Sequence, residues 1–299
     1  MPVNLHLLRI FHAVAELRSF SRAGEALFIS QPAVSKGVRE LERQLDVPLI
    51  ERGAHVGRGV KLTESGAALA EHARGIFALE RAAAEDLRAR VELRQGRLLL
   101  GASTTIAAYW LPPYLATFAR QFPGIELQVR VGNTRAIGAA LIGCEIDLAL
   151  VEGPLEDARL TATHWRDDEL QIIVHPQAAL VGKRRPTVAQ LNANVWLLRE
   201  PGSGTREVTE RMLRAQRIVP ARTIELGSNE AIARAAAAGL GVAMLPAHVV
   251  QELTRLGELA IVQNPSTGRL LRPLFVLQLR QRPQSQVVRA FREVLRERA

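Results

Sequence analysis

The chain has 299 residues, with 39 lysine and arginine residues against 30 aspartate and glutamate residues, and a formal net charge of +9. This length predicts two or three domains, and the single cysteine, Cys144, excludes an internal disulfide framework and a redox switch built from a cysteine pair. No hydrophobic run is long enough to span a membrane, and the N-terminus lacks the apolar core of a signal peptide, so we expect a cytoplasmic protein without a membrane partner.

Residues 5–30 show two amphipathic patterns in tandem, which predict two short helices. The apolar positions of the first pattern lie at helical spacing and are Leu7, Ile10, Phe11, Val14 and Leu17. A capping serine, Ser19 or Ser21, precedes the second pattern. Ser30 is a good N-cap, and Pro32 is tolerated only in a first helical turn, so a third helix is predicted to begin near Gln31.

The third helix has a buried face and an outward face. The buried face carries apolar residues at helical spacing, namely Val34, Val38, Leu41 and Leu45. The outward face carries polar and basic residues, namely Gln31, Ser35, Lys36, Arg39 and Arg43. Such a helix fits the major groove of DNA, where glutamine can pair with adenine and lysine can meet base edges or phosphates. We therefore predict a helix-turn-helix whose last helix reads bases from its N-terminal turns.

A basic hairpin is predicted to follow the third helix. Gly57 and Gly59 suit a tight turn, and Arg58 and Lys61 sit where a hairpin could lie along a phosphate backbone. A solvated surface is the simpler interpretation of any one of these charges. The order helix, turn, helix and hairpin, with Arg52 leading into the hairpin, nevertheless favours a winged helix-turn-helix that binds DNA.

From Glu64 to Arg94 the sequence contains no proline and only two glycines, which predicts one long helix. Apolar residues recur near heptad spacing at Leu69, Ala73, Ile76, Ala83, Leu87 and Val91. A helix of this length that extends from a small domain has little to bury against except another copy of itself, so we predict a dimerisation arm. Two copies would read the two halves of a pseudo-palindromic operator.

Beyond Gly96 strands and helices alternate, which predicts an α/β region with strands buried on both faces. The predicted strands form two series, at 97–103, 125–132 and 147–153, and at 170–176, 195–201, 223–227 and 242–246. Two similar α/β subdomains are implied. The last strand and helix, within 270–298, have too few partners to stand alone and must return to one of the two subdomains.

Polar side chains gather where strands end and helices begin, and there they would direct backbone N–H groups toward a cleft between the subdomains. The candidates in the first subdomain are Ser103, Thr104, Thr105, Asn133 and Thr134. In the second, the polar run from Arg199 to Arg206 contributes Ser203, Thr205 and Arg206 as the expected contacts, and Ser228 and Asn229 follow farther along the chain. Helix N-termini with hydroxyl groups and an arginine suit an anion, although for each serine alone an N-cap is the simpler interpretation.

The chain resembles LysR-type transcriptional regulators in the N-terminal stretch FHAVAELRSFSRAGEALFISQPAVSKGVRELERQLDVPLIERGAHVGRGVKLTESG. The resemblance implies base or backbone contacts at Gln31, Pro32, Ser35 and Lys36. It implies phosphate contacts at the helix that starts near Ser21 and at the wing near Arg52. With the outward face of the third helix, the predicted DNA-binding residues are Ser19, Ser21, Gln31, Pro32, Ser35, Lys36, Arg39, Arg52 and Arg58.

The same resemblance implies the rest of the organisation. Residues 1–63 would form the winged helix-turn-helix, 64–95 a linker helix, and 96–299 an effector-binding domain that looks like a periplasmic binding protein. Its first subdomain would comprise 96–163 and 268–299 and its second 164–267, with crossovers near Thr161 to Asp168 and near Asn264 to Gly268. The implied partners are double-stranded promoter DNA and further copies of the chain, as a homodimer and a homotetramer, and RNA polymerase is a further candidate.

The run REPGSGTR, from Arg199 to Arg206, resembles one branch of the family in particular. This branch contains regulators of carbon fixation and of sulfite or cysteine metabolism, whose effectors are anionic metabolites or oxyanions. The resemblance therefore implies an anionic effector in the cleft, and we expect no metal and no other cofactor.

Three features depart from the family pattern, and they concern the predicted DNA-reading surface. Gly37 replaces a larger polar residue, at a cost of ~1 kcal/mol relative to alanine in a helix interior. Ile50 stands where phenylalanine is usual, and the wing from Arg52 to Lys61 is a few residues longer than the family norm.

An enzyme or a small-molecule-binding protein with an accessory DNA-binding domain is the alternative function, with GSGTR as a phosphate loop. The sequence lacks a GK[ST] ending, an acid and base at motif spacing, and a metal-ligand cluster among its seven histidines, so we expect no enzyme. A purely architectural DNA-binding protein is disfavoured because most of the chain forms the α/β region.

Overall fold

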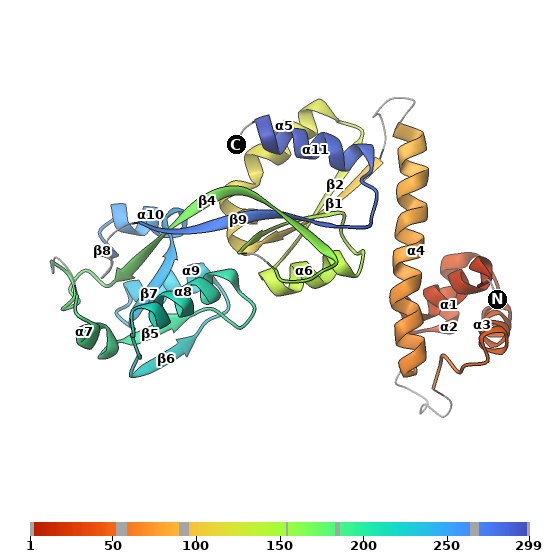
Figure 1. Ribbon diagram of the computed structural model, residues 1–299, viewed down its shortest axis with the longest axis horizontal. Helices are drawn as coiled ribbons and strands as arrows, with labels where there is room; N and C mark the ends of the chain where they lie inside the picture. The colour runs from red at the N-terminus through yellow and green to blue at the C-terminus, as the bar shows by residue number, and fades with distance from the viewer. Residues whose placement is uncertain are drawn as a thin grey trace. The chain divides into compact units, whose positions relative to one another are not determined.

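The computed structural model describes residues 3–51, 59–89, 96–153, 155–182, 186–263 and 269–297. The chain divides into two compact units, an N-terminal unit (Met1–Glu85) and a C-terminal unit (Asp86–Ala299). In Figure 1 the regular elements in the described part of the N-terminal unit are helices, whereas the C-terminal unit contains a long twisted sheet with helices around it. No helix in the described ranges combines the length and the apolar content that crossing a membrane requires.

The N-terminal unit begins with three short helices, α1 (Leu5–Leu17), α2 (Phe20–Leu27) and α3 (Gln31–Leu45). They bury a common apolar core that includes Leu8, Phe11, Val14, Val34 and Leu41. The Ser19 hydroxyl accepts a hydrogen bond from the Arg22 backbone N–H at 3.3 Å, and the Ser30 hydroxyl accepts one from Ala33 at 3.4 Å. The predicted caps of α2 and α3 are therefore confirmed, with Ser19 rather than Ser21 as the cap of α2.

The long helix α4 (Glu64–Ala89) packs its first half against the three short helices. Ala70 and Ala73 are buried in the common core, and a Cβ at Gly66 would lie 2.0 Å from the Leu49 carbonyl oxygen. The expectation that this helix has little to bury against except another copy is therefore wrong for its first half. Ile76 and Leu79 stay exposed farther along the helix. The predicted continuation to Arg94 lies outside the described residues.

The C-terminal unit is built on one sheet that carries nine strands in the described ranges, in the order β2-β1-β3-β9-β4-β7-β5-β6, with β8 paired to β4. The strands are β1 (Gly96–Ser103), β2 (Ile125–Gly132), β3 (Leu148–Glu152), β4 (Leu160–Val174), β5 (Val195–Leu198), β6 (Arg222–Glu225), β7 (Val242–Pro246), β8 (Ala260–Val262) and β9 (Leu270–Leu279). The antiparallel pair β4 and β9 runs through both halves of the sheet. We call the half around β1–β3 the first lobe and the half around β5–β7 the second lobe.

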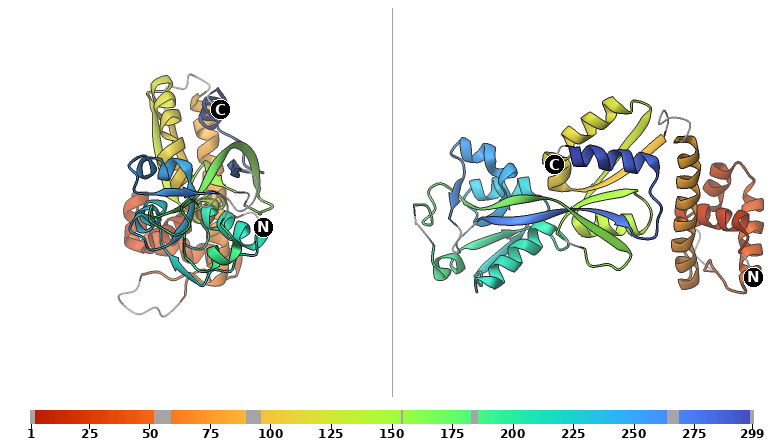
Figure 2. Two further views of the ribbon diagram at one scale, coloured as in Figure 1. Left: turned by 90° about the vertical axis from the view of Figure 1, so that its left-hand side faces the viewer. Right: turned by 45° about the horizontal axis from the view of Figure 1, so that its top comes forward.

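Helices cover both faces of each lobe (Figures 1 and 2). The first lobe carries the π-helix η1 (Ile106–Trp110), α5 (Pro112–Gln121), α6 (Thr134–Ile142) and α11 (Gln286–Glu297). The second carries α7 (Val188–Asn192), α8 (Gly204–Ala215), α9 (Asn229–Ala237) and α10 (Ala247–Arg255). Phe118 of α5 contacts Phe291 of α11 edge to face, so the C-terminal helix packs on the first lobe.

Some details differ from the sequence-based expectations. The crossover expected near Thr161 to Asp168 lies inside the continuous strand β4, whose pairing with β9 shifts in register between His164 and Arg166. The second expected crossover, at 264–268, lies outside the described residues. Strand β2 is half exposed rather than buried on both faces because it is an edge strand.

Candidate DNA-binding face and effector site

The outward face of α3 presents the side chains that the sequence predicts for DNA. Gln31, Pro32, Lys36 and Arg39 are exposed, and Ser35 is half-buried. The Arg39 Nε donates a hydrogen bond to the Ser35 carbonyl oxygen at 3.3 Å, which holds its guanidinium along the helix. The first turns of α3 therefore offer an amide, a hydroxyl and two cations on one accessible surface.

Two further predicted DNA contacts flank this face. Ser21 is exposed in the first turn of α2, while the Ser19 hydroxyl oxygen caps that helix by accepting the Arg22 N–H. Arg52 and Arg58, in the predicted wing, lie outside the described residues. The base of the wing is described: the Glu51 N–H donates to the Lys61 carbonyl oxygen at 3.0 Å, as in a hairpin.

Gly37 does not lie on the DNA-reading surface, so the expectation that it alters operator contacts is wrong. It is buried, and a Cβ at Gly37 would lie 2.8 Å from the Ile10 Cδ1 atom of α1. The absence of a side chain here lets α3 approach α1 closely. The departure from the family pattern therefore concerns helix packing.

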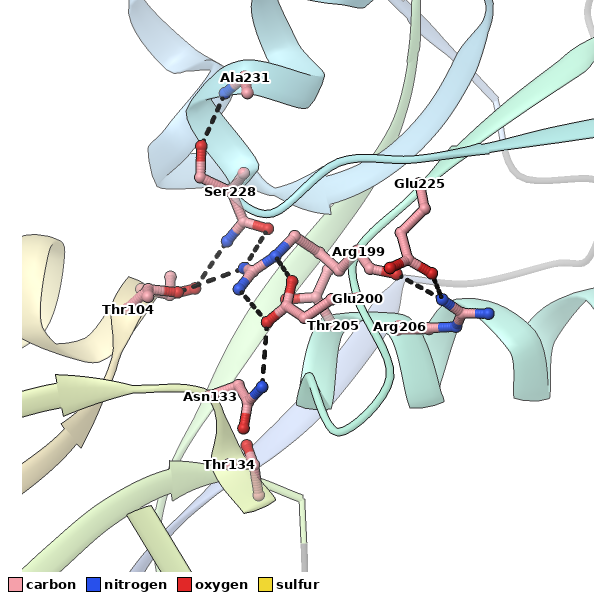
Figure 3. A network of polar contacts seen from close by, with 12 residues as sticks. Thr104, Asn133, Thr134, Arg199, Glu200, Thr205, Arg206, Glu225, Ser228 and Ala231 are labelled. Carbon is pink, nitrogen blue, oxygen red and sulfur yellow. Dashed lines mark hydrogen bonds and ion pairs between the residues drawn. The ribbon is translucent and has the colours of Figure 1, made fainter. Parts of the chain in front are cut away.

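In the C-terminal unit a buried guanidinium lies where the two lobes meet. Arg199 follows β5, and its Nη1 donates to the Thr104 hydroxyl of the first lobe at 3.2 Å and to the Asn229 side-chain oxygen at 3.0 Å. Its Nε and Nη2 donate to the two carboxylate oxygens of Glu200 at 2.8 and 2.9 Å. Figure 3 shows this guanidinium at the centre of the polar network.

Glu200 connects this guanidinium to the first lobe. Its Oε1 also accepts a hydrogen bond from the Asn133 amide at 3.2 Å, and Asn133 itself caps α6. Burial raises the pKa of Glu200, but hydrogen bonds from Arg199, from its own backbone and from Asn133 outweigh burial and hold the pKa below its ordinary value. Glu200 is therefore a carboxylate at neutral pH.

Thr105, Ser228 and Ser103 lie beside this cluster. The Asn229 amide donates to the Thr105 hydroxyl at 2.9 Å, and the Ser228 hydroxyl caps α9 by accepting from the Ala231 N–H at 3.0 Å. Ser103, at the end of β1, is 1% exposed, and its hydroxyl has no hydrogen-bond partner in the described part of the chain. A buried hydroxyl without a partner is costly unless a ligand or water satisfies it.

The structure does not bring Arg206 to the Arg199 cluster. Its guanidinium donates to Glu210 and Glu225, each at 2.7 Å, and to the Arg199 carbonyl oxygen at 2.8 Å. Figure 3 shows it pointing away from the Arg199 guanidinium. The hydrogen bond that Arg206 donates to the Glu210 carboxylate raises the pKa of Arg206, so this arginine is held as a cation by its own carboxylate partners.

A second buried network lies where β4 and β9 pass between the lobes. Arg272 is 0% exposed, and its Nη2 lies 2.7 Å from Asp168 Oδ2 and 3.5 Å from Glu152 Oε1. Its Nη1 donates to the Thr205 hydroxyl at 2.8 Å, and the Thr134 hydroxyl donates to Glu152 at 3.2 Å. Thr134 and Thr205 thus belong to this network rather than to the Arg199 cluster.

The Arg272 network contains two carboxylates for one guanidinium. Burial raises the pKa of Asp168, and the neighbouring Arg272 only partly opposes this effect. The lobes approach closely here, since a Cβ at Gly204 of α8 would lie 2.6 Å from the Glu152 carbonyl oxygen of the first lobe. Ser203, the residue before Gly204, is buried at the same helix start and makes no side-chain capping bond.

Sequence reasoning placed Arg199 and Glu200 in the polar run from Arg199 to Arg206 but did not select them as contact residues, and it did not mark Arg272. Arg199 is the first polar residue after the apolar strand VWLL, and side chains at that position of a parallel strand face the ligand-binding edge of a sheet. This signal was available for Arg199 and Glu200. Arg272 lies in a strand whose pairing with β4 cannot be read from spacing, so nothing in the sequence pattern marked it.

Two family models match this chain. The LysR substrate binding domain matches residues 91–299, and the bacterial regulatory helix-turn-helix of the lysR family matches residues 5–67. The chain belongs to the LysR family of transcriptional regulators. In this LysR regulator the N-terminal unit is a helix-turn-helix DNA-binding domain followed by α4, and the C-terminal unit is an effector-binding domain, which confirms the predicted fold class.

Relatives of this LysR regulator lie in the branch that the REPGSGTR run indicates. It is 35% identical to the regulator CfxR of Cupriavidus necator over 272 residues, which cover 89% of this chain and 82% of CfxR. It is 32% identical to the RuBisCO operon transcriptional regulator of Allochromatium vinosum over 303 residues, or 100% and 98% of the two chains. The CcmR regulatory domain of Synechocystis, solved with 2-phosphoglycolate, is 32% identical, matches with a TM-score of 0.62, and covers 67% of this chain and 96% of its own.

Proposed function

We propose that this LysR regulator binds a small anionic effector between its two lobes and that the bound effector changes how its DNA-binding domains contact promoter DNA. The observation that carries this proposal is the buried Arg199 guanidinium, which donates hydrogen bonds to side chains of both lobes. A desolvated guanidinium with a planar fork of donors suits carboxylate or phosphate recognition. An anion held there would stabilise the lobes against each other.

Two further observations support an anion at this place. The unpartnered Ser103 hydroxyl is next to Thr104 in the chain and could donate to a ligand oxygen. The related CcmR domain was solved with 2-phosphoglycolate, a phosphate monoester, which makes this compound a suitable probe. We propose Ser103, Thr104, Asn133 and Arg199 as the effector-contacting residues, with Thr105 and Ser228 supporting them.

Arg206 has a different role in this proposal from the one that its sequence motif suggests. Because Glu210 and Glu225 already neutralise it, we assign it to holding the β5–α8 connection. Thr134, Ser203 and Thr205 likewise belong to the helix starts that meet at the Arg272 network.

A pair of matched substitutions tests the proposal. In full-length protein, Arg199→Gln should abolish the thermal shift produced by 2-phosphoglycolate, whereas Arg206→Gln should retain it, because a ligand raises stability only where it binds the native state. Operator affinity without ligand should stay within about twofold of wild type in both variants, since the DNA-binding domain is a separate compact unit. Loss of the shift in Arg206→Gln alone would assign the anion to Arg206 instead.

We also propose that α4 pairs two copies of the chain. Ile76, Leu79 and Leu87 are exposed apolar residues along this helix, which a homodimer would cover. Leu79→Arg should shift the protein toward monomer in analytical ultracentrifugation, and an unchanged sedimentation coefficient would contradict pairing through α4. A homotetramer, and RNA polymerase as a partner on the promoter, extend this proposal.

A further inference from the structure

The Glu200 carboxylate occupies the Arg199 donors that an anionic effector would need. Its carboxylate makes a two-point contact with the Arg199 guanidinium, at 2.8 and 2.9 Å, and this is the geometry that a free carboxylate or phosphate adopts on an arginine. The same carboxylate accepts the Asn133 hydrogen bond from the opposite lobe. The protein therefore bridges its own lobes with an internal anion (Figure 3).

This bridge uses the groups that the proposed effector would use. Arg199 Nε and Nη2 both donate to Glu200, and its third nitrogen, Nη1, donates to Thr104 and to Asn229. The Glu200 side chain is the more accessible partner, at 24% exposed against 2% for Arg199. The carboxylate can therefore leave toward solvent, while the guanidinium stays buried.

We infer that Glu200 is a built-in competitor of the effector, which must displace the Glu200 carboxylate from Arg199 and Asn133 in order to bind. The inference rests on the proposed function, since it concerns the same anion site. Because Glu200 is adjacent to Arg199 in the chain, it competes at the high effective concentration of a tethered group. An untethered anion needs an advantage over it.

The nature of that advantage defines the class of effector. A monocarboxylate offers Arg199 the same two oxygens as Glu200 and gains nothing from the exchange. A phosphate monoester carries ≈ −1.5 to −2 charge at pH 7 and three strong acceptor oxygens, so it can hold Arg199 and also accept from hydroxyl donors. Ser103 and Thr104 are the hydroxyls at hand. Competition from Glu200 thus selects dianions of the phosphate type over simple carboxylates.

Glu200→Gln tests the inference, because it keeps the size of the side chain and removes its charge. In isothermal titration calorimetry of full-length protein, Glu200→Gln should bind 2-phosphoglycolate on the order of tenfold more tightly than wild type, the fold-change that corresponds to one charged hydrogen bond. Acetate, which wild type should bind weakly or not at all, should gain more in affinity than 2-phosphoglycolate does. The preference for phosphate over carboxylate should therefore narrow.

Glu225→Gln is the matched control, since it removes a carboxylate from Arg206 in the same lobe without touching Arg199. It should leave the affinity for both probes within about twofold of wild type. Glu200→Asp retains the charge but shortens the reach, so it should fall between wild type and Glu200→Gln, and it provides a second variant if Glu200→Gln does not fold.

The outcomes separate this inference from the proposed function. Equal or weaker binding of 2-phosphoglycolate by Glu200→Gln, with wild-type binding intact, would show that Glu200 orients Arg199 or contacts the ligand, and would overturn competition alone. Binding by Glu200→Gln where wild type shows none would support it most strongly. Absence of binding of 2-phosphoglycolate, inorganic phosphate and acetate by all variants would overturn both proposals.

Discussion

The outward face of α3 and the junction between the lobes both carry basic side chains, but these side chains differ in their exposure and in their partners. Lys36 and Arg39 are exposed, whereas Arg199 and Arg272 are buried and each meets a carboxylate. Exposed cations suit a long polyanion that is bound through many weak, salt-sensitive contacts. Buried and pre-oriented guanidinium groups suit one small anion or one fixed internal partner. Accessibility, more than the number of charges, thus separates the two binding tasks of this regulator.

The largest expected effect follows from removing a buried charge. Arg272→Ala leaves Asp168 and Glu152 without their buried guanidinium, which should reduce the free energy of unfolding by about 3–5 kcal/mol. Urea unfolding followed by tryptophan fluorescence measures this selectively, because all three tryptophans, Trp110, Trp165 and Trp196, lie in the C-terminal unit.

Arg130→Ala is the control for Arg272→Ala, because Arg130 forms an exposed ion pair with Glu145. Its loss should change the free energy of unfolding by less than about 1 kcal/mol. If the two variants are equally stable, burial of the cation does not determine how much its ion pair contributes to the free energy of unfolding.

Removing an exposed cation should instead weaken DNA binding. Lys36→Ala should lower operator affinity by about 1–3 kcal/mol if Lys36 contacts a base, and should reduce the slope of log affinity against log salt by about 1 if it contacts a phosphate. Fluorescence anisotropy titrations between about 50 and 200 mM salt, where the affinity of protein–DNA complexes falls steeply, distinguish a base contact from a phosphate contact. Arg43→Ala, whose cation is already paired with Glu40 at 2.6 Å, should have less effect than Lys36→Ala. The reverse order would move the DNA-reading surface along α3.

A pH effect should distinguish the Glu200 bridge from exposed ion pairs. The pKa of Glu200 is lowered on folding, so its contribution to stability is present above the ordinary glutamate pKa of about 4.3 and is lost as pH falls through the folded-state value. Wild type should exceed Glu200→Gln in free energy of unfolding by about 1 kcal/mol at pH 7, and the difference should shrink below about pH 4. A difference that does not change between pH 7 and pH 3 would show that the carboxylate charge is irrelevant to this bridge.

The smallest expected effect concerns Gly37. Alanine there gains ~1 kcal/mol of helix propensity but requires the flexible end of Ile10 to shift, so stability should change by less than about 1 kcal/mol in either direction. Operator affinity and sequence preference should not change, because the position is buried. A changed operator preference in footprinting, with stability unchanged, would show that position 37 affects DNA recognition and not only helix packing.

Local patterns predicted the elements that depend on local chemistry. The caps at Ser19 and Ser30 and the start of α3 could be read from the sequence because a cap, a proline and an apolar period act within a few residues. Gly37 was misassigned because family resemblance gave its position in the helix but not the direction in which its Cα faces. The close approach of Ile10 depends on how α1 and α3 pack.

The candidate effector site was predicted only in part, for a similar reason. Ser103, Thr104 and Asn133 were placed correctly near strand ends, because parallel strands end at one edge of a sheet. Which arginine of the 199–206 run faces that edge depends on the turn after β5, and charge patterns do not encode it. Likewise, the partnership of Arg272 with Asp168 joins residues 104 positions apart, which only the pairing of β4 with β9 brings together.

The return of β9 and α11 to the first lobe affects the order in which the chain can fold during synthesis. The helices of the N-terminal unit are consecutive in sequence, so this unit can fold as soon as it leaves the ribosome. The first lobe cannot, because β3 must wait for β9, and Phe118 must wait for Phe291. Until β9 and α11 emerge, a nascent chain that already carries a DNA-reading helix has no complete effector-binding domain. A growing chain can therefore acquire its affinity for DNA before its control by an effector.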